Sequence, residues 1–288
     1  MSLSSQFLVQ SKERVEAAID RLVPTAQDRP GNLHEAMRYS LMAGGKRLRP
    51  ALCYAAFEDC GGTGESADFG AVAVEMVHTF SLIHDDLPCM DDDDFRRGMP
   101  TCHKKFGEAM AVLAGDALSI LAFDVLSRAG SAEAIGLLAR ALGSDGMLGG
   151  QVVDIESEGL PPVLETVEYI HIHKTAALIE ASLELGALLA GADAERRSLY
   201  REYGRCVGLA FQIVDDILDI EASTEALGKD AGSDLENQKA TWPAVVGLER
   251  SKREARELVE RAELLCSRMG PRGPVLAELA RFIVERGN

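Results

Sequence analysis

Apolar residues recur at intervals of three and four along most of the chain, as they do on the buried face of an α-helix. The spacing is clearest in residues 175–190 (TAALIEASLELGALLA) and 251–269 (SKREARELVERAELLCSRM). Alternating patterns that would indicate strands joined by tight turns are essentially missing. The pattern predicts an all-α protein.

Glycine, proline and serine gather at six places, where we expect the helices to end: residues 24–32, 61–66, 159–162, 191–193, 228–233 and 270–274. The segments between them are about 20–30 residues long, against a usual helix length of about 11–12. No charge-rich linker or change of composition marks a domain boundary. We therefore expect residues 1–288 to form a single domain, a bundle of long helices with their apolar faces turned inward.

Residues 109–126 are apolar around more than half of the predicted helix. Such a helix is either buried on several sides or lines an interface between subunits, and a dimer is expected in the second case. The same region is the best candidate for a membrane span, but Asp116 interrupts it and no apolar run reaches about 18 residues. No stable membrane insertion is expected.

The net charge of −16 argues against nucleic acid or an anionic membrane as a partner. The six cysteines form no C-x-x-C pair, and the first twenty residues lack the features of a signal peptide. A cytoplasmic protein with reduced thiols is expected. With this charge, an anionic phosphate ester could bind only through metal cations or a local basic cluster.

The first of two aspartate clusters lies in residues 84–98 (HDDLPCMDDDDFRRG), where six carboxylates occur within ten residues. Acidic runs are most often solvated loops, but carboxylates this close repel one another unless cations compensate them. Pro88 cannot continue the preceding helix, because it lacks an N–H and its ring clashes with the turn before it. The chain should therefore loop out after Asp86 and return Asp91 towards Asp85.

The second cluster, residues 211–219 (FQIVDDILD), lies within a predicted helix. Asp215 and Asp219 are four residues apart, so they share one face, where paired carboxylates destabilise a helix. A metal ion is the simplest compensation, and oxygen ligands that leave room for water and phosphate favour Mg²⁺. Two such clusters on separate apolar helices predict a magnesium site between them.

Basic residues also gather in two places. The first group lies between two glycines and Pro50 and consists of Lys46, Arg47 and Arg49. This arrangement can bring backbone and guanidinium groups to a phosphate. A helix that ends on glycine with cations beside it would look the same. Arg96 and Arg97 follow the first aspartate cluster directly, and could either bind an anion or only neutralise the aspartates.

The pattern D-D-x-x-x-x-D followed by R-R-G, with F-Q-x-x-D-D-x-L-D later in the chain, resembles the trans-polyprenyl diphosphate synthases, in particular the bacterial farnesyl diphosphate synthase type. The resemblance extends to residues 44–50 (GGKRLRP), His78, residues 173–175 (HKT), 228–229 (GK) and 239–243 (KATWP). It implies the isoprenoid synthase fold, a central cavity and a homodimer. It also implies Mg²⁺-dependent, head-to-tail condensation of isopentenyl diphosphate with allylic diphosphates (dimethylallyl, geranyl).

The same resemblance assigns roles to single residues. Metal ligands would be Asp85, Asp91 and Asp215, with Asp86, Asp216 and Asp219 in or next to the ligand set. Isopentenyl diphosphate would be bound by Lys46, Arg49, His78 and Arg97. The allylic diphosphate would be surrounded by Arg96, Lys174, Thr175, Gln212, Lys229 and Lys239. The residues that would act in catalysis are Asp85, Asp91, Asp215, Lys174 and Arg96. The released diphosphate is the expected proton acceptor.

Phe80, five residues before Asp85, should point down the cavity wall about one turn below the aspartates, with the small Ser81 beside it. A bulky residue there resembles enzymes that stop at the fifteen-carbon farnesyl product, so farnesyl diphosphate is expected. The twenty-carbon geranylgeranyl product is the alternative. Phe80 could also be an ordinary core residue.

Three other classes stay open. A terpene cyclase would share the fold, but usually carries a different second metal motif and an aromatic cavity, whereas aromatic residues make up only 5% of this chain. A non-catalytic synthase subunit could have lost metal ligands, but both clusters are intact here. A metal-dependent phosphohydrolase would form no carbon–carbon bond. Cys102-His103 and His171/His173 could suggest zinc or a nucleophile, but the remaining ligands are not evident.

Overall fold

The computed structural model describes residues 2–226 and 241–285, and this part of the chain is almost entirely helical. The helices are α1 Leu3–Leu22, α2 Gly31–Leu41, α3 Leu48–Asp59, α4 Ser66–Asp85, α5 Cys102–Phe106, α6 Glu108–Ser127, α7 Ala132–Leu142, α8 Met147–Ser157, α9 Leu164–Ile170, α10 Ala177–Leu189, α11 Ala194–Ala226, α13 Trp242–Val246, α14 Leu248–Cys266 and α15 Gly273–Glu285. A π-helical turn, η1 (His171–Ala176), joins α9 to α10. The all-α prediction is confirmed.

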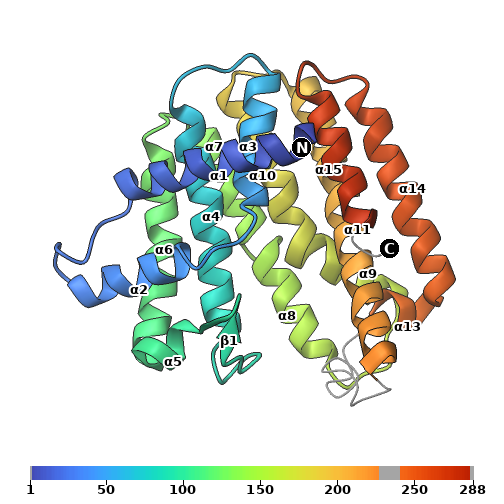
Figure 1. Cartoon of the computed structure of the whole chain (residues 1–288), viewed down its shortest axis with the longest axis horizontal. Helices are drawn as coiled ribbons and strands as arrows, with labels where there is room; N and C mark the ends of the chain where they lie inside the picture. Colours follow the sequence, from blue (N-terminus) through green and yellow to red (C-terminus); the bar gives the residue numbers. More distant parts are fainter. Residues whose placement is uncertain (1, 227–240, 286–288) are drawn as a thin grey trace.

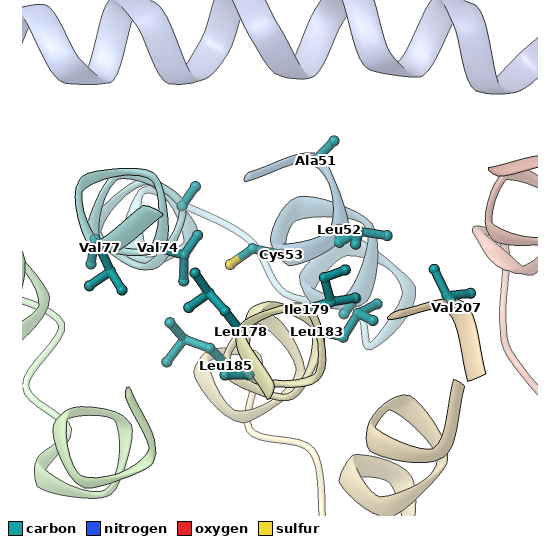
Figure 2. Packing of buried hydrophobic residues seen from close by; sticks show 14 of the residues in the cluster. Ala51, Leu52, Cys53, Val74, Val77, Leu178, Ile179, Leu183, Leu185 and Val207 are labelled. Carbon is teal, nitrogen blue, oxygen red and sulfur yellow. The ribbon is translucent and has the colours of Figure 1, made fainter. Parts of the chain in front are cut away.

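The core of the bundle is built around α10, which packs against α3, α4 and α11. Figure 2 shows Leu178, Ile179 and Leu183 of α10 among Leu52 of α3 and Val77 of α4. These five side chains are almost wholly buried. The outer helices α6 and α14 pack against α4 and α11, while α1 lies across the bundle (Figure 1). The three- and four-residue spacing of the sequence therefore corresponds to helices that bury one face or more.

Most of the expected breaks coincide with ends of helices. Five of them lie between successive helices or run into the start of the next helix: residues 24–32, 61–66, 159–162, 191–193 and 270–274. The break at 228–233 lies outside the described residues. A break at Gly143–Gly146, between α7 and α8, was not predicted, because its flanking apolar residues continue the helical spacing.

A short hairpin interrupts the helical chain after the first aspartate cluster. Strand β1 (Phe95–Arg96) pairs antiparallel with β2 (Met99–Pro100). The two residues between them, Arg97 and Gly98, both have positive φ (55° and 77°), as a tight two-residue hairpin turn requires. Strands this short carry no alternating pattern, so the sequence could not reveal them. The hairpin and α5 lie at the end of the bundle where α4 ends (Figure 1).

Helix α6 leaves much of its apolar surface uncovered. It is the one helix in the described ranges that is long and apolar enough to cross a membrane, and 39% of the tested stretch is buried. Leu113 and Ile120 are 54% and 70% exposed, while the opposite face packs on α4. The helix packs against α2, α4, α5 and α7 and still leaves Leu113 and Ile120 exposed, so it is buried on several sides without being covered all round, and the dimer stays a prediction.

Glu180 of α10 gives a prediction about stability and pH. Burial raises the pKa of its carboxyl from 4.5 to about 7, and Arg205 and Arg201 only partly oppose this. The folded chain thus keeps a proton that the unfolded chain releases, so stability falls as pH rises from 4.5 to about 7. Glu180→Gln should raise the melting temperature over wild type by a margin that grows across this window and is constant above it. Thermal melts at stepped pH test this. Glu260→Gln, at an exposed position, is the control. If Glu180→Gln raised the melting temperature by the same amount at every pH, the prediction would be wrong.

Candidate active site

A cavity of about 710 Å³ opens between α4, α6, α8, η1, α11 and the hairpin. Its lining contains eleven of the residues that the sequence assigned to the site: Arg49, His78, Phe80, Ser81, Asp85, Arg96, Arg97, Lys174, Thr175, Gln212 and Asp215. The rest of the lining is mostly apolar and includes Leu82, Leu87, Val112, Met147, Leu148 and Phe211. Charged groups and an apolar chamber thus share one space, which suits a substrate with an anionic head and a hydrocarbon tail.

The loop of the first aspartate cluster folds back as predicted. Helix α4 ends at Asp85, and the chain turns so that the backbone N–H of Asp91 donates to the carbonyl oxygen of Asp85 at 2.8 Å. A second backbone bond, from Asp92 N–H to the carbonyl of Leu87 at 3.1 Å, closes the turn that contains Pro88. Two carboxylates six positions apart are therefore brought together by backbone geometry.

Asp85 lies in an environment that disfavours its charge. Burial raises the pKa of its carboxyl to about 6, and the neighbouring Asp91 adds to this, while Lys174 and Arg96 oppose it. Burial also raises the pKa of Asp86, although the Arg96 guanidinium donates to it at 2.6 Å. Because Asp86 has this partner and does not line the cavity, Asp85 is the residue of the pair that faces the cavity.

The second cluster is divided between two faces of α11. Asp215 lines the cavity, and Asp219 follows one turn later on the same side of the helix. Asp216 is turned into the protein, where it is 9% exposed and accepts the backbone N–H of Trp242 at 2.7 Å. That Asp216 and Asp219 contribute to metal binding stays a prediction.

These residues fit a hard divalent cation. Asp85 and Asp215 supply only oxygen atoms, which Mg²⁺ prefers, and the open cavity leaves room for water and phosphate oxygens. Burial raises the pKa of Asp85 and Asp91 adds to this, so a bound cation would stabilise the ionised carboxylate. Within the described ranges, one further group of possible ligands lies close together, Asp92, Asp94 and His103, with ligand atoms within 4.8 Å. Lys104 already pairs with Asp94 at 2.6 Å, so this group has a cation of its own.

Two arginines and a histidine, Arg49, Arg97 and His78, lie close together in the cavity lining. The guanidinium of Arg97 donates to the carbonyl of Gly44 at 2.5 Å and passes over Gly45. A Cβ at Gly45 would meet that guanidinium at 2.8 Å, and its φ of +107° also requires glycine. Arg49 and His78 line the same space, and burial together with Arg49 and Arg97 lowers the pKa of His78 well below its ordinary value. His78 is therefore a neutral imidazole that can donate one hydrogen bond.

The two other basic residues of residues 44–50 lie elsewhere. Arg47 is 3% exposed and donates to Glu75 at 2.6 Å, so it serves the core instead of a phosphate. Lys46 is exposed, with its ammonium 4.8 Å from the ring centre of Phe282, and it does not line the cavity. Binding of isopentenyl diphosphate by Lys46 stays a prediction.

The π-helical turn η1 carries the residues of the HKT segment. Lys174 Nζ lies 2.5 Å from Asp154 of α8, and the Thr175 hydroxyl donates to Gln212 of α11 at 2.8 Å. Helix α8 can approach this turn because it has Gly150 there, where a Cβ would lie 2.2 Å from the backbone nitrogen of Lys174. Single π-turns are rare and often occur at functional sites. No local pattern in the sequence indicated this one.

Some assignments fall outside these observations. Lys229 and Lys239 lie outside the described residues. His84, Gln151 and Leu148 line the cavity but were not predicted, because their spacing does not distinguish them from other helical positions. His84 packs edge-on against Phe80, with ring centres 5.8 Å apart, so the two form one wall.

An all-α bundle with two aspartate clusters and a basic group around one cavity has the isoprenoid synthase fold. Its structure is similar to an FPP/GFPP synthase from Zymomonas mobilis, with 37% identity, a TM-score of 0.86 and coverage of 98% of this chain and 100% of that chain. A decaprenyl diphosphate synthase from Rhodobacter capsulatus gives 27% identity and a TM-score of 0.89, over 99% and 98% of the two chains.

Residues 30–264 match the polyprenyl synthetase family, and the chain belongs to it. The large subunit 1 of a heterodimeric geranylgeranyl pyrophosphate synthase from Arabidopsis thaliana is 50% identical over 98% of this chain and 79% of its own length. A geranylgeranyl pyrophosphate synthase from Catharanthus roseus is 48% identical over 98% and 81%. The chain is thus a transferase of isoprenoid biosynthesis that joins prenyl units head to tail.

Proposed function

We propose that this chain condenses isopentenyl diphosphate with allylic diphosphates and that its main product is geranylgeranyl diphosphate. The observation that carries the product length is the identity of about half of all positions with geranylgeranyl pyrophosphate synthases, over 98% of the chain. This departs from the farnesyl product expected from the sequence, which rested on Phe80 alone.

Farnesyl diphosphate is the second candidate, and Phe80 favours it. The ring lies in the cavity wall beside His84 and is 5% exposed. Four residues, 81–84, separate Phe80 from Asp85 along α4. However, the cavity also reaches Leu148, whose side chain is 46% exposed at the bundle surface. Phe80 is therefore one wall of the chamber and Leu148 is another, and a longer tail directed along Leu148 is part of the proposal.

The chemistry follows from the residues around the cavity. Asp85, Asp91 and Asp215 would hold magnesium, which when bound supplies positive charge against the diphosphate leaving group. Lys174 and Arg96, at the same end, stabilise the negative charge that develops as the allylic carbon–oxygen bond breaks. Arg49, Arg97 and neutral His78 hold isopentenyl diphosphate so that its double bond faces the allylic carbon. The apolar lining keeps water from the cation, and the released diphosphate takes the proton.

A homodimer is part of the proposal. Two helices carry exposed apolar residues, α6 (Leu113, Ile120) and α8 (Leu148, Val152, Ile155), and Leu148 also lines the cavity. A second copy packed against these residues would cover apolar surface and form part of the chamber wall at Leu148. Sedimentation of the purified chain at micromolar concentration measures the assembly directly.

The product assay uses purified protein, Mg²⁺, dimethylallyl diphosphate and labelled isopentenyl diphosphate, with dephosphorylated products sized by chromatography. A twenty-carbon alcohol is expected. A fifteen-carbon alcohol would replace the proposed product with the second candidate and leave the reaction unchanged. Cyclised or merely hydrolysed substrate would refute the condensation itself.

Phe80→Ala should lengthen the product by one or more five-carbon units, whichever product wild type makes. The substitution removes the ring from the cavity wall and leaves a hollow beside His84. Chromatography of the products from equal amounts of enzyme measures this. Ser81→Ala, which changes a neighbouring lining residue by one hydroxyl, should leave the length unchanged. A folded Phe80→Ala variant with the wild-type product would show that Phe80 does not limit the chain.

A further inference from the structure

A buried cluster of polar side chains lies behind the cavity, between η1, α11 and α13. Asp216 receives the backbone N–H of Trp242 at 2.7 Å, and His171 Nε2 lies 3.2 Å from the same carboxylate oxygen. The rings of His171 and Trp242 stack with their centres 5.5 Å apart and their planes 18° from parallel. Each of the three residues is less than 10% exposed.

Within the described part of the chain, the members of this cluster hold one another in place. His171 Nδ1 is buried and has no hydrogen-bond partner within residues 2–226 and 241–285. The ring is therefore oriented by Asp216 and Trp242. Trp242 is in turn held by its indole N–H, which donates to Glu254 of α14 at 2.7 Å. A carboxylate that receives a backbone N–H and an imidazole is well enough satisfied to be buried.

Two of the three members, Asp216 and His171, are joined by the chain to groups that line the cavity. Asp216 directly follows Asp215, and successive helical residues point about 100° apart, so one faces the cavity while the other faces the cluster. His171 is the first residue of η1, which also carries Lys174 and Thr175. The contact between His171 and Asp216 therefore fixes the second aspartate cluster against the turn that carries Lys174.

We propose that His171, Asp216 and Trp242 form a positioning unit that holds Asp215 in place for metal binding and sets its distance from Lys174. The inference rests on the proposed function, in that Asp215 is taken as a metal ligand. None of the three residues needs to touch metal or substrate for this role. Groups that orient metal ligands in this way typically contribute about 10–100-fold in metal affinity or activity.

The test measures Mn²⁺ affinity directly, by the electron paramagnetic resonance signal of free Mn²⁺, without any turnover. His171→Phe keeps a ring to stack on Trp242 and removes the nitrogen that faces Asp216. We expect it to weaken Mn²⁺ binding by about 10–100-fold. Asp215→Asn should show the same or a greater loss, which identifies the site being measured.

His173→Phe is the matched control in the same turn. His173 stacks on Tyr169, with ring centres 3.8 Å apart, and it does not line the cavity. This variant should bind Mn²⁺ as wild type does. Melting temperatures measured in a chelator show whether His171→Phe is folded. If the folded variant bound Mn²⁺ as tightly as wild type, the proposal would be overturned and the cluster would only pack the helices together.

Two polar variants keep the test decisive if His171→Phe does not fold. The amide of His171→Gln reaches about as far as the imidazole Nε2 and should retain wild-type affinity, whereas the shorter His171→Asn should not. Equal affinities for these two would also overturn the proposal. Because the readout is metal binding, it stays valid if the product assay refutes the proposed condensation, so the two failures can be told apart.

Discussion

Asp85→Asn should lower kcat/KM by about 10³-fold, because a metal ion that stabilises a leaving group contributes several kcal/mol and each 1.36 kcal/mol is tenfold in rate. The substitution keeps the shape of the side chain and removes its charge. Asp85 lines the cavity at the end of α4, where the Asp91 N–H fixes the loop through the Asp85 backbone, which the change leaves intact. Steady-state kinetics at saturating Mg²⁺ measure the loss.

The same variant should not be less stable than wild type. Burial raises the pKa of Asp85 to about 6 and the charge of Asp91 adds to this, so the ionised form, which still predominates at pH 7, costs the folded chain stability when no metal is bound. A neutral amide relieves that repulsion, and the melting temperature in a chelator should stay equal or rise. Functional sites often contain side chains that lower the stability of the fold but are needed for activity.

Asp92→Asn is the control for Asp85→Asn, because Asp92 belongs to the same acidic run and is exposed but, unlike Asp85 and Asp91, is not proposed to hold the metal. It should keep kcat/KM close to wild type. If both variants lost activity equally, the acidic run would act through its total charge, and the distinct position of Asp85 would have no catalytic meaning.

Local physics made much of the site predictable from sequence. Pro88 cannot continue the helix, which allows the chain to bring Asp91 back towards Asp85, and the 2.8 Å backbone bond confirms this return. The four-residue spacing of Asp215 and Asp219 requires one helical face in any structure that keeps the helix. These predictions depend on neighbours in the chain, for which the geometry is nearly fixed.

Partners that are distant in sequence could not be predicted in the same way. Helical spacing shows which face of a helix is buried, but not what covers it. The contact of the Asp216 carboxylate with the backbone N–H of Trp242 in α13 could therefore not be predicted. The π-turn from His171 to Ala176 is also invisible, because its apolar spacing suits an α-helix equally well. Product length is hard to predict for a related reason, since it depends on every wall of the cavity and not on Phe80 alone, and it stays a proposal.

The pair Arg47 and Arg49 shows how one basic motif divides between two tasks. The side chain of Arg47 is fully buried against Glu75, itself 3% exposed, with 2.6 Å between nitrogen and oxygen. Arg49, two residues on, lines the cavity, and its buried Nε has no hydrogen-bond partner in the described part of the chain. Burial lowers the pKa of Arg49 to about 10, which still leaves it charged at neutral pH.

Arg47→Leu should therefore destabilise the fold by about 3–5 kcal/mol, because it leaves the Glu75 carboxylate buried without its cation. At about 2–4 °C per kcal/mol, the melting temperature should fall by roughly 6 °C or more. Adding Glu75→Leu should restore most of the loss, since an apolar pair of similar volume can replace a buried ion pair. Thermal melts of the single and double variants measure both effects.

Arg49→Leu should show the opposite behaviour. We expect a melting temperature near that of wild type and a KM for isopentenyl diphosphate raised by about 10–100-fold, which corresponds to one or two lost hydrogen bonds to a charged group. If Arg47→Leu at a permissive temperature raised this KM as much as Arg49→Leu, Arg47 would contact substrate and its pairing with Glu75 would not be its main role. A KM unchanged in Arg49→Leu would instead remove Arg49 from the diphosphate site. The two variants thus distinguish Arg47, which holds α3 in the core, from Arg49, which faces the substrate. The sequence alone gives both residues the same charge and so does not distinguish them.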